Sequence, residues 1–313
     1  MALNTARVTF TLSPKGFFIL TSPTGAILGM LTASMYSNGT AFLGFFVLDP
    51  SIRGQGLGGA LFGKCLDYVL AQGIKTVGLD AVQDQVGTYG RRGFKDCGQK
   101  VVMYERQPTI SDSAQVAEEV TDIKQASVSA LAEMDYQHTG FRRDALWKIL
   151  LEQADLEGWA IEKNGELKAM IVARKTTDGW KIGPLYAEEP EHAQSLLQHT
   201  IRELGDEVLK AEVWVQNNHV EKLLQVTGWT KSFVMSVGVS YDARYVANVQ
   251  CRGCGMANLL EPRRRKTCIL SSTLVVDEDQ GEHYAYCSTT FVLIDSRELE
   301  FEFTKCRHLP PED

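Results

Sequence analysis

A glycine-rich turn between an apolar run and an amphipathic helix is the feature that most constrains the fold. The turn reads Arg53-Gly54-Gln55-Gly56-Leu57-Gly58, and the apolar residues 42–48 before it predict a buried strand. Apolar side chains recur at helical spacing behind it and stop at a glycine, which predicts a helix: Leu57, Leu61, Cys65, Val69 and then Gly73. This arrangement leaves backbone N–H groups at the positive end of a helix dipole. A phosphate or pyrophosphate fits there.

The turn by itself is also compatible with an ordinary tight strand–helix connection. It lacks the lysine of a nucleotide-phosphate loop, and its glycines depart from the dinucleotide-binding order. More information comes from downstream, where residues 76–82 predict a second strand and residues 89–94 read Tyr-Gly-Arg-Arg-Gly-Phe.

Taken together, these elements resemble the GNAT N-acetyltransferase superfamily. The matching pieces are a strand ending in Val-x-x-Pro (residues 47–50), Arg-Gly-x-Gly-x-Gly (53–58), a helix, a second strand, and Tyr-x-x-x-Gly-Phe (89–94). The resemblance covers residues 15–106 and implies an α/β fold with a mixed, mostly antiparallel sheet flanked by helices. Residues 78–89 and 182–187 are similar to the subgroup with two tandem GNAT domains. Members of that subgroup begin with a further strand and helices. This chain opens close to the segment Ser13-Pro14-Lys15-Gly16-Phe17-Phe18, so we expect those elements to be missing here.

The resemblance implies acetyl-CoA as co-substrate and no metal. In the family, the glycine turn holds the pyrophosphate and the preceding strand offers backbone groups to the pantetheine arm. The cofactor-binding residues expected on this basis are Phe46, Val47, Leu48, Arg53, Gly54, Gln55, Gly56, Leu57, Gly58 and Gly59.

Two residues are expected to carry the chemistry. Tyr89 occupies the position of the family's general acid, and a phenol pKa near 10 suits proton donation to a departing thiolate. The alternative is an aromatic that packs under the cofactor. The strand at 42–45 has no carboxylate to act as base, so Asp80 is the nearest substitute, with Asp84 or water as alternatives.

A second copy of the pattern follows the first. Gly93-Phe94 recurs as Gly228-Trp229, an offset of 135 residues, which places Glu188 on Arg53 and Leu224 on Tyr89. Acidic residues and Pro190 disfavour a pyrophosphate there, so we expect this copy to keep the fold without binding acetyl-CoA. Tyr186, expected after a strand, and Arg143, in a loop at 138–143, are candidates for acceptor binding. Their alternatives are a core aromatic and a solvated loop.

The expected domains are a first GNAT domain at 1–108, a degenerate one at 109–245 and a β-rich extension at 246–313. In the extension, residues 289–303 alternate like antiparallel strands. Cys251-x-x-Cys254 resembles one zinc knuckle, but the usual second pair is missing, so incidental thiols are expected instead.

The composition limits the binding partners and the cellular location that we expect for the protein. A net charge of −7 argues against nonspecific nucleic-acid binding, and no apolar run reaches membrane-spanning length. Seven scattered cysteines suggest reduced thiols and a cytoplasmic location. Nothing indicates an oligomeric state.

Two functions therefore remain open. One is an acetyl-CoA-dependent N-acetyltransferase acting on a small-molecule amine or amino acid. The other is a catalytically silent acyl-CoA-binding or interaction module on the same scaffold.

Overall fold

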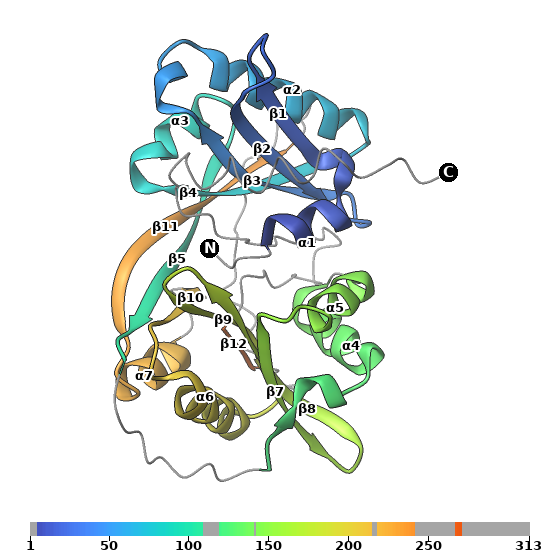
Figure 1. Cartoon of the computed structure of the whole chain (residues 1–313), viewed down its shortest axis with the longest axis vertical. Coiled ribbons are helices and arrows are strands. Elements are labelled where there is room, and N and C mark those ends of the chain that lie inside the picture. The colour runs from blue at the N-terminus through green and yellow to red at the C-terminus, as the bar shows by residue number, and fades with distance from the viewer. Residues whose placement is uncertain (1–4, 109–118, 141, 215–217, 242–266, 271–313) are drawn as a thin grey trace.

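The computed structural model describes residues 5–108, 119–140, 142–214, 218–241 and 267–270. Its strands form one mixed, mostly antiparallel sheet in the order β1-β2-β3-β4-β11-β5-β10-β9-β8-β7-β6, with β12 beside β9. Figure 1 shows two lobes, one above the other, joined along one side by the long strands β5 and β11. The expected fold class is confirmed.

The first copy forms the upper lobe. Its elements in chain order are α1 (Thr5–Leu12), β1 (Phe17–Thr21), β2 (Ile27–Met35), β3 (Thr40–Leu48), α2 (Leu57–Ala71), β4 (Thr76–Val82), α3 (Val86–Gly90) and β5 (Lys95–Arg106). The strands and helix expected around the glycine turn are β3, α2 and β4. The expectation that no helix precedes the first strand is wrong: α1 lies there, and no apolar periodicity in TARVTFTL announces it.

The second copy forms the lower lobe. Its elements are β6 (Thr121–Asp122), α4 (Val128–Thr139), α5 (Asp144–Leu151), β7 (Leu156–Lys163), β8 (Glu166–Thr176), β9 (Gly179–Ala187), α6 (Pro190–Leu204), β10 (Leu209–Trp214), α7 (Asn218–Val226) and β11 (Thr230–Tyr241). From the extension only β12 (Thr267–Leu270) is described. Cys251, Cys254 and the strands expected at 289–303 lie outside the described residues.

The two copies exchange their last strands. β11, from the second copy, pairs antiparallel with β4 of the first, from Met235↔Val82 to Tyr241↔Thr76. In return β5 pairs with β10, from Leu209↔Arg106 to Trp214↔Val101. The boundary expected at residue 108 falls between β5 and β6, yet the sheet runs across it. Each copy therefore needs a strand of the other to complete its sheet.

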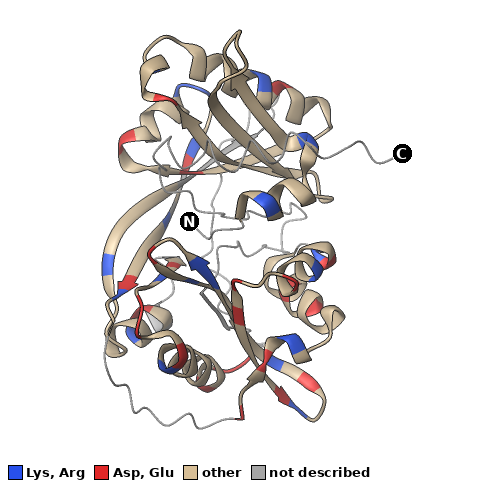
Figure 2. Cartoon of the chain, in the orientation of Figure 1, with Lys and Arg blue, Asp and Glu red and all other residues tan. Residues whose placement is uncertain are grey.

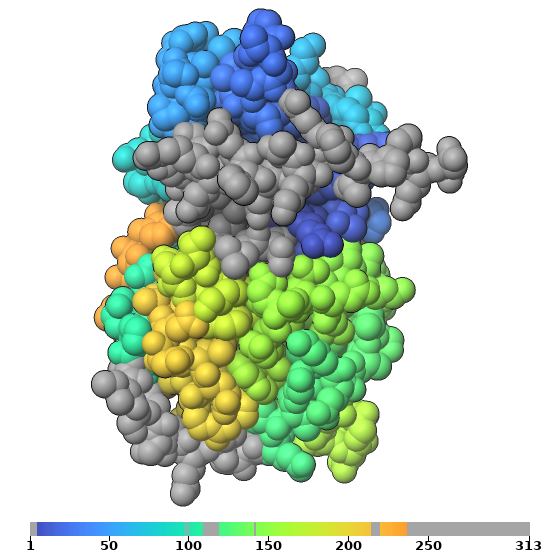
Figure 3. Space-filling model, viewed as in Figure 1, coloured from blue at the N-terminus to red at the C-terminus, as the bar shows by residue number. Residues whose placement is uncertain are grey.

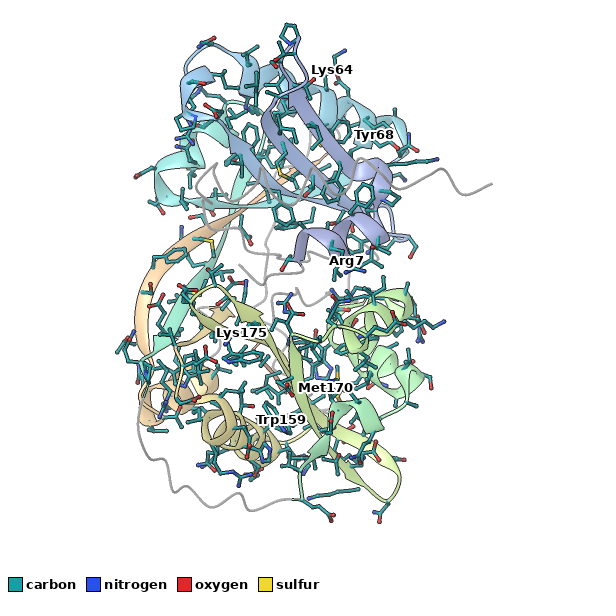
Figure 4. The ribbon with its side chains drawn as sticks, in the orientation of Figure 1. Arg7, Lys64, Tyr68, Trp159, Met170 and Lys175 are labelled. Atoms are coloured by element: carbon teal, nitrogen blue, oxygen red, sulfur yellow. The ribbon has the colours of Figure 1, made fainter. Side chains whose placement is uncertain are left out.

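Each lobe has helices on both faces of the sheet. In the first copy, α2 covers one face through Leu61, Phe62 and Cys65, and α1 lies on the opposite face. In the second copy, α6 covers one face while α4 and α5 cover the other. Figure 4 labels Trp159 of β7, which packs against the α6 side, and Met170 of β8, which belongs to the core under α4 and α5.

The lobes also touch through α1. Val8 of α1 belongs to the same buried cluster as Trp147 and Leu150 of α5. In the space-filling view of Figure 3, the dark blue surface of the first residues meets the green surface of the second copy. Figure 2 shows basic and acidic residues interspersed along the ribbons of both copies.

Candidate active site

The backbone of β3 separates from that of β4 along half of its length. The two strands pair in parallel at Thr40↔Thr76, Ala41↔Val77 and Phe42↔Gly78, and no further pair follows. At this point Phe45 has a left-handed φ of 48°, an uncommon and strained conformation outside glycine. Residues 46–48 therefore keep backbone groups on their β4 side that do not pair with that strand. We call this opening the first split.

The glycine turn lies at the mouth of the first split. Gly56 caps α2 with φ of 81°, and Gly54 has φ of 77°, both in the region that favours glycine. A Cβ at either position would meet no atom within 4 Å, so the turn faces open space. At Gly58 a Cβ would lie 2.4 Å from Leu48 Cδ1, so glycine lets the helix approach β3 closely. The first N–H groups of α2 lack intrahelical acceptors and can bind an anion.

Two arginines lie near this turn in different roles. Arg53 donates from Nε and Nη2 to the Leu48 carbonyl at 3.0 and 2.9 Å, which ties the turn to the end of β3. Arg92 lies over the Phe62 ring, 5.0 Å from its centroid, and its Nη2 would be 3.1 Å from a Cβ at Gly59. Arg92 thus brings a positive charge to the first turns of α2. The sequence reasoning missed it, although it lies inside the Tyr-x-x-x-Gly-Phe segment.

Tyr89 packs on the α2 face of the sheet. Its ring lies 5.8 Å from that of Phe62 and 6.3 Å from that of Phe94. Burial raises the pKa of Tyr89, and the charge of Arg92 partly opposes the rise. The phenol therefore stays protonated at neutral pH, as a proton donor must. The ring contacts fit an aromatic that packs under a cofactor, and the raised pKa fits a proton donor.

Asp80 faces the opposite side of β4. Its neighbours Leu79 and Ala81 belong to the core under α2, so the alternation of the strand turns Asp80 towards the second copy. There its charge acts on Lys181 of β9, which donates to Glu212 at 2.7 Å. Burial lowers the pKa of Lys181, and the carboxylates of Glu212 and Asp80 oppose that shift. Tyr89 and Asp80 thus lie on opposite faces of the sheet, with the first split between them.

The second copy has a similar split but no turn. β9 and β10 pair in parallel only at Leu209↔Trp180, Lys210↔Lys181 and Ala211↔Ile182. The tail strand β12 then pairs with β9 at Leu185, Tyr186 and Ala187. Only residues 188–189 separate β9 from α6, whereas residues 49–56 separate β3 from α2. Six residues of the turn are therefore missing from this copy.

Because of these six missing residues, the two copies do not align at a constant offset of 135 residues. From β3 to β9 the offset is 139, and from α2 to α6 it is 133, because the turn was shortened between them. Val47 matches Tyr186 and not Ile182, and Arg53 has no counterpart at Glu188. The offset holds beyond α3: the N–H of Phe94 bonds the Tyr89 carbonyl at 3.2 Å, and that of Trp229 bonds Leu224 at 3.0 Å. Leu224 does replace Tyr89.

The two expected acceptor residues meet through a third residue that the sequence reasoning missed. Asp135 of α4 accepts from Arg143 Nε at 2.8 Å and Nη2 at 2.5 Å, and from the Tyr186 hydroxyl at 3.1 Å. His138 stacks on Tyr186 at 4.5 Å. Tyr186 lies inside β9 and is fully buried, not beyond the strand as expected. It therefore contacts Arg143 through Asp135. Asp135 could be found from sequence only as an acid in an apolar helix.

A pocket of about 300 Å³ opens between the two copies. Its walls are α1 and the β2–β3 hairpin of the first copy, and α5, β8 and β9 of the second; Arg143 lines it. In the described part of the chain, no group of three or more His, Cys, Asp or Glu side chains is placed to hold a metal ion. None of the described helices is long and apolar enough to cross a membrane.

Comparison with known proteins agrees with this architecture. A model described as "Acetyltransferase (GNAT) family" matches residues 4–94, and one described as "Acetyltransferase (GNAT) domain" matches residues 131–242. A curated relative, the holothin acyltransferase of Pseudoalteromonas sp. (strain SANK 73390), is 26% identical over 188 residues. That match spans 57% of this chain and 58% of the relative's length, less than two thirds of it.

Solved structures share the fold. A putative acetyltransferase from Pyrococcus horikoshii superimposes with a TM-score of 0.64 at 18% identity, over 76% of this chain and 78% of its own. A tandem GNAT protein from the clavulanic acid biosynthesis pathway gives 0.56 at 12% identity, over 75% and 87%. Two GNAT models match successive parts of the chain, and the strand order repeats with them. The protein belongs to the GNAT acyltransferase superfamily and carries two GNAT domains in tandem.

Proposed function

We propose that the protein is an acetyl-CoA-dependent N-acetyltransferase whose first copy binds the thioester and transfers its acetyl group to the amine of a small molecule or amino acid. One observation carries this proposal: among the described residues, only the first copy combines a split that no strand fills with the glycine turn at a helix N-terminus. Those features suit an extended arm that ends in a pyrophosphate.

The chemistry follows from the two faces of the sheet. The amine nitrogen attacks the thioester carbon, the C–S bond breaks, and an amide and a thiol result. A backbone N–H near residues 47–48 stabilises the developing oxyanion. Asp80, on the face turned to the second copy, accepts the proton that the amine loses, directly or through water. Tyr89, protonated on the α2 face, donates a proton to the departing sulfur.

The competing function is a silent acyl-CoA-binding module. Two observations favour this function. Strand β3 carries no carboxylate that could act as a base, and the charge of Asp80 already acts on Lys181. This interaction with Lys181 gives Asp80 a structural role that requires no catalysis.

Thiol release separates the two. Purified full-length protein is incubated with acetyl-CoA and a panel of amines, and free CoA is measured with a thiol reagent, with product mass confirming the amide. The transferase predicts release that depends on the acceptor. Tight acetyl-CoA binding without release for any amine identifies the silent module.

A further inference from the structure

The pocket between the copies lies on the same side of the first copy's sheet as Asp80. Leu31 and Ala33 of β2 pack under α2, so Ser34, the next residue, faces the other way and lines the pocket. Asp80 faces that side for the same reason. The pocket thus approaches the first split from the face opposite α2.

Strand register brings the pocket close to the reacting end of the split. Ser34 pairs with Phe42, and Phe42 pairs with Gly78, two residues before Asp80. Adjacent strands lie about 4.8 Å apart, so the wall at Ser34 is roughly 10 Å from β4. Phe42↔Gly78 is also the last pair before β3 and β4 part. A small molecule in the pocket lies beside the closed end of the split.

Two buried polar atoms in the lining have no hydrogen-bond partner among the described residues: Nε1 of Trp147 and Oγ1 of Thr5. Trp147 is 1% exposed and Thr5 is 8% exposed. A buried donor without an acceptor costs free energy, so such a group in a native protein needs an explanation. A bound oxygen ligand provides one, because an indole N–H can only donate and a hydroxyl can also donate.

The rest of the lining combines an apolar wall with charged side chains. Leu146, Leu150, Leu156 and Val172 supply an aliphatic wall from the second copy. Three guanidinium groups and one carboxylate line the pocket: Arg142, Arg143, Arg174 and Asp155. Arg142 pairs with Glu133 and Arg143 with Asp135, while the charge of Arg174 reaches Lys181 on the neighbouring strand. These ion pairs offset two of the three positive charges, so the donors of Trp147 and Thr5, which have no partner in the described part of the chain, carry the preference for an oxygen ligand.

We propose that this pocket holds the acceptor, and that the acceptor is a small amine carrying a carboxylate and an apolar side group, as a hydrophobic amino acid does. This inference rests on the proposed function. The carboxylate accepts from the indole of Trp147 and the hydroxyl of Thr5. The apolar group packs on the wall from α5 and β8, and the amine points to the side where Asp80 lies. The second copy thereby selects the acceptor for the first.

The test is a titration of full-length protein with two probes that differ only in the carboxylate, phenylalanine and 2-phenylethylamine. We expect phenylalanine to bind about tenfold more tightly or better, because hydrogen bonds to a charged group are strong. Trp147→Phe keeps an aromatic ring and removes the N–H, so it should weaken phenylalanine binding about tenfold and leave 2-phenylethylamine binding unchanged. Thr5→Val should act in the same direction.

Trp229→Phe is the matched control. Trp229 is also buried with an indole N–H that has no partner among the described residues, but it does not line the pocket. Its replacement should leave both affinities unchanged, and thermal melting checks that every variant is folded.

Equal affinity for the two probes, or equal weakening of both by Trp147→Phe, overturns the inference. Transfer to 2-phenylethylamine by a protein that does not bind phenylalanine overturns this acceptor class and leaves the proposed function intact. Binding of phenylalanine with this variant pattern, but no transfer to any amine, supports the pocket's chemistry and overturns the transferase.

Discussion

The two copies share a fold and differ at a few positions that decide binding. Both have a split that opens after three parallel pairs, a following helix of 15 residues and a last strand of 12 residues. The first copy adds six residues of turn, and in the second β12 lies along the split. The apolar pattern therefore preserves the architecture, and we propose that one loop and one paired strand edge determine whether a ligand can enter.

The second copy contributes structurally to the first copy and to the pocket. Its β11 completes the first copy's sheet beside β4, and its α5, β8 and β9 form one side of the pocket. The proposed loss of cofactor binding in the second copy is compatible with retention of the whole chain, because the first copy depends on the second for a strand and for one side of the pocket.

The largest expected effect is at the glycine turn. Gly56→Glu should abolish acetyl-CoA binding, because φ of 81° strains any side chain and a carboxylate repels the pyrophosphate. Titration calorimetry measures the loss. Gly63→Glu is the control, since it adds the same charge within α2 at a position with no atom within 4 Å of the new Cβ. If Gly56→Glu still binds at full affinity, the cofactor is elsewhere.

A smaller effect is expected at Tyr89. Tyr89→Phe should lower kcat about 100-fold or more and leave acetyl-CoA affinity nearly unchanged, because only the proton is removed. Since burial raises the pKa of this phenol, the wild-type rate should not fall through loss of the Tyr89 proton until the pH exceeds its ordinary value near 10. Steady-state kinetics with chemistry limiting provides the measurement. An unchanged kcat would leave Tyr89 with packing alone.

The smallest effect is expected in the second copy. Pro190→Ala restores an N–H at the first turn of α6, and Pro190 was one sequence-based reason for expecting no binding there. Because the turn itself is missing, this variant should gain no acetyl-CoA site and should lose about 1 kcal/mol of stability or less. Titration and thermal melting check both points. A new site in this variant would mean that the proline, and not the deletion, silences the copy.

The sequence predicts the parts of the fold that depend on local pattern. The strand 76–82, the helix after Gly56 and the stripe of α6 follow from apolar spacing, and all three are found. Strand exchange could not be predicted, because no local signal in β5 or β11 says which neighbour each strand will pair with.

The candidate site divides in the same way. The turn and Tyr89 belong to short contiguous motifs and could be located in the sequence. The role of Asp135 depends on its contacts with Arg143 and with Tyr186, which is 51 residues further along the chain. The six-residue difference in the turn was missed because the alignment of the copies used one dipeptide, Gly93-Phe94 against Gly228-Trp229. An offset from one dipeptide does not reveal a change in loop length elsewhere in the chain.

The number of acetyl-CoA sites per chain tests the difference between the copies most directly. Wild-type protein titrated with acetyl-CoA by calorimetry should show one site per chain, and Gly56→Glu should remove it without exposing another. Two equivalent sites in the wild type, or a residual full-affinity site in Gly56→Glu, would contradict the account.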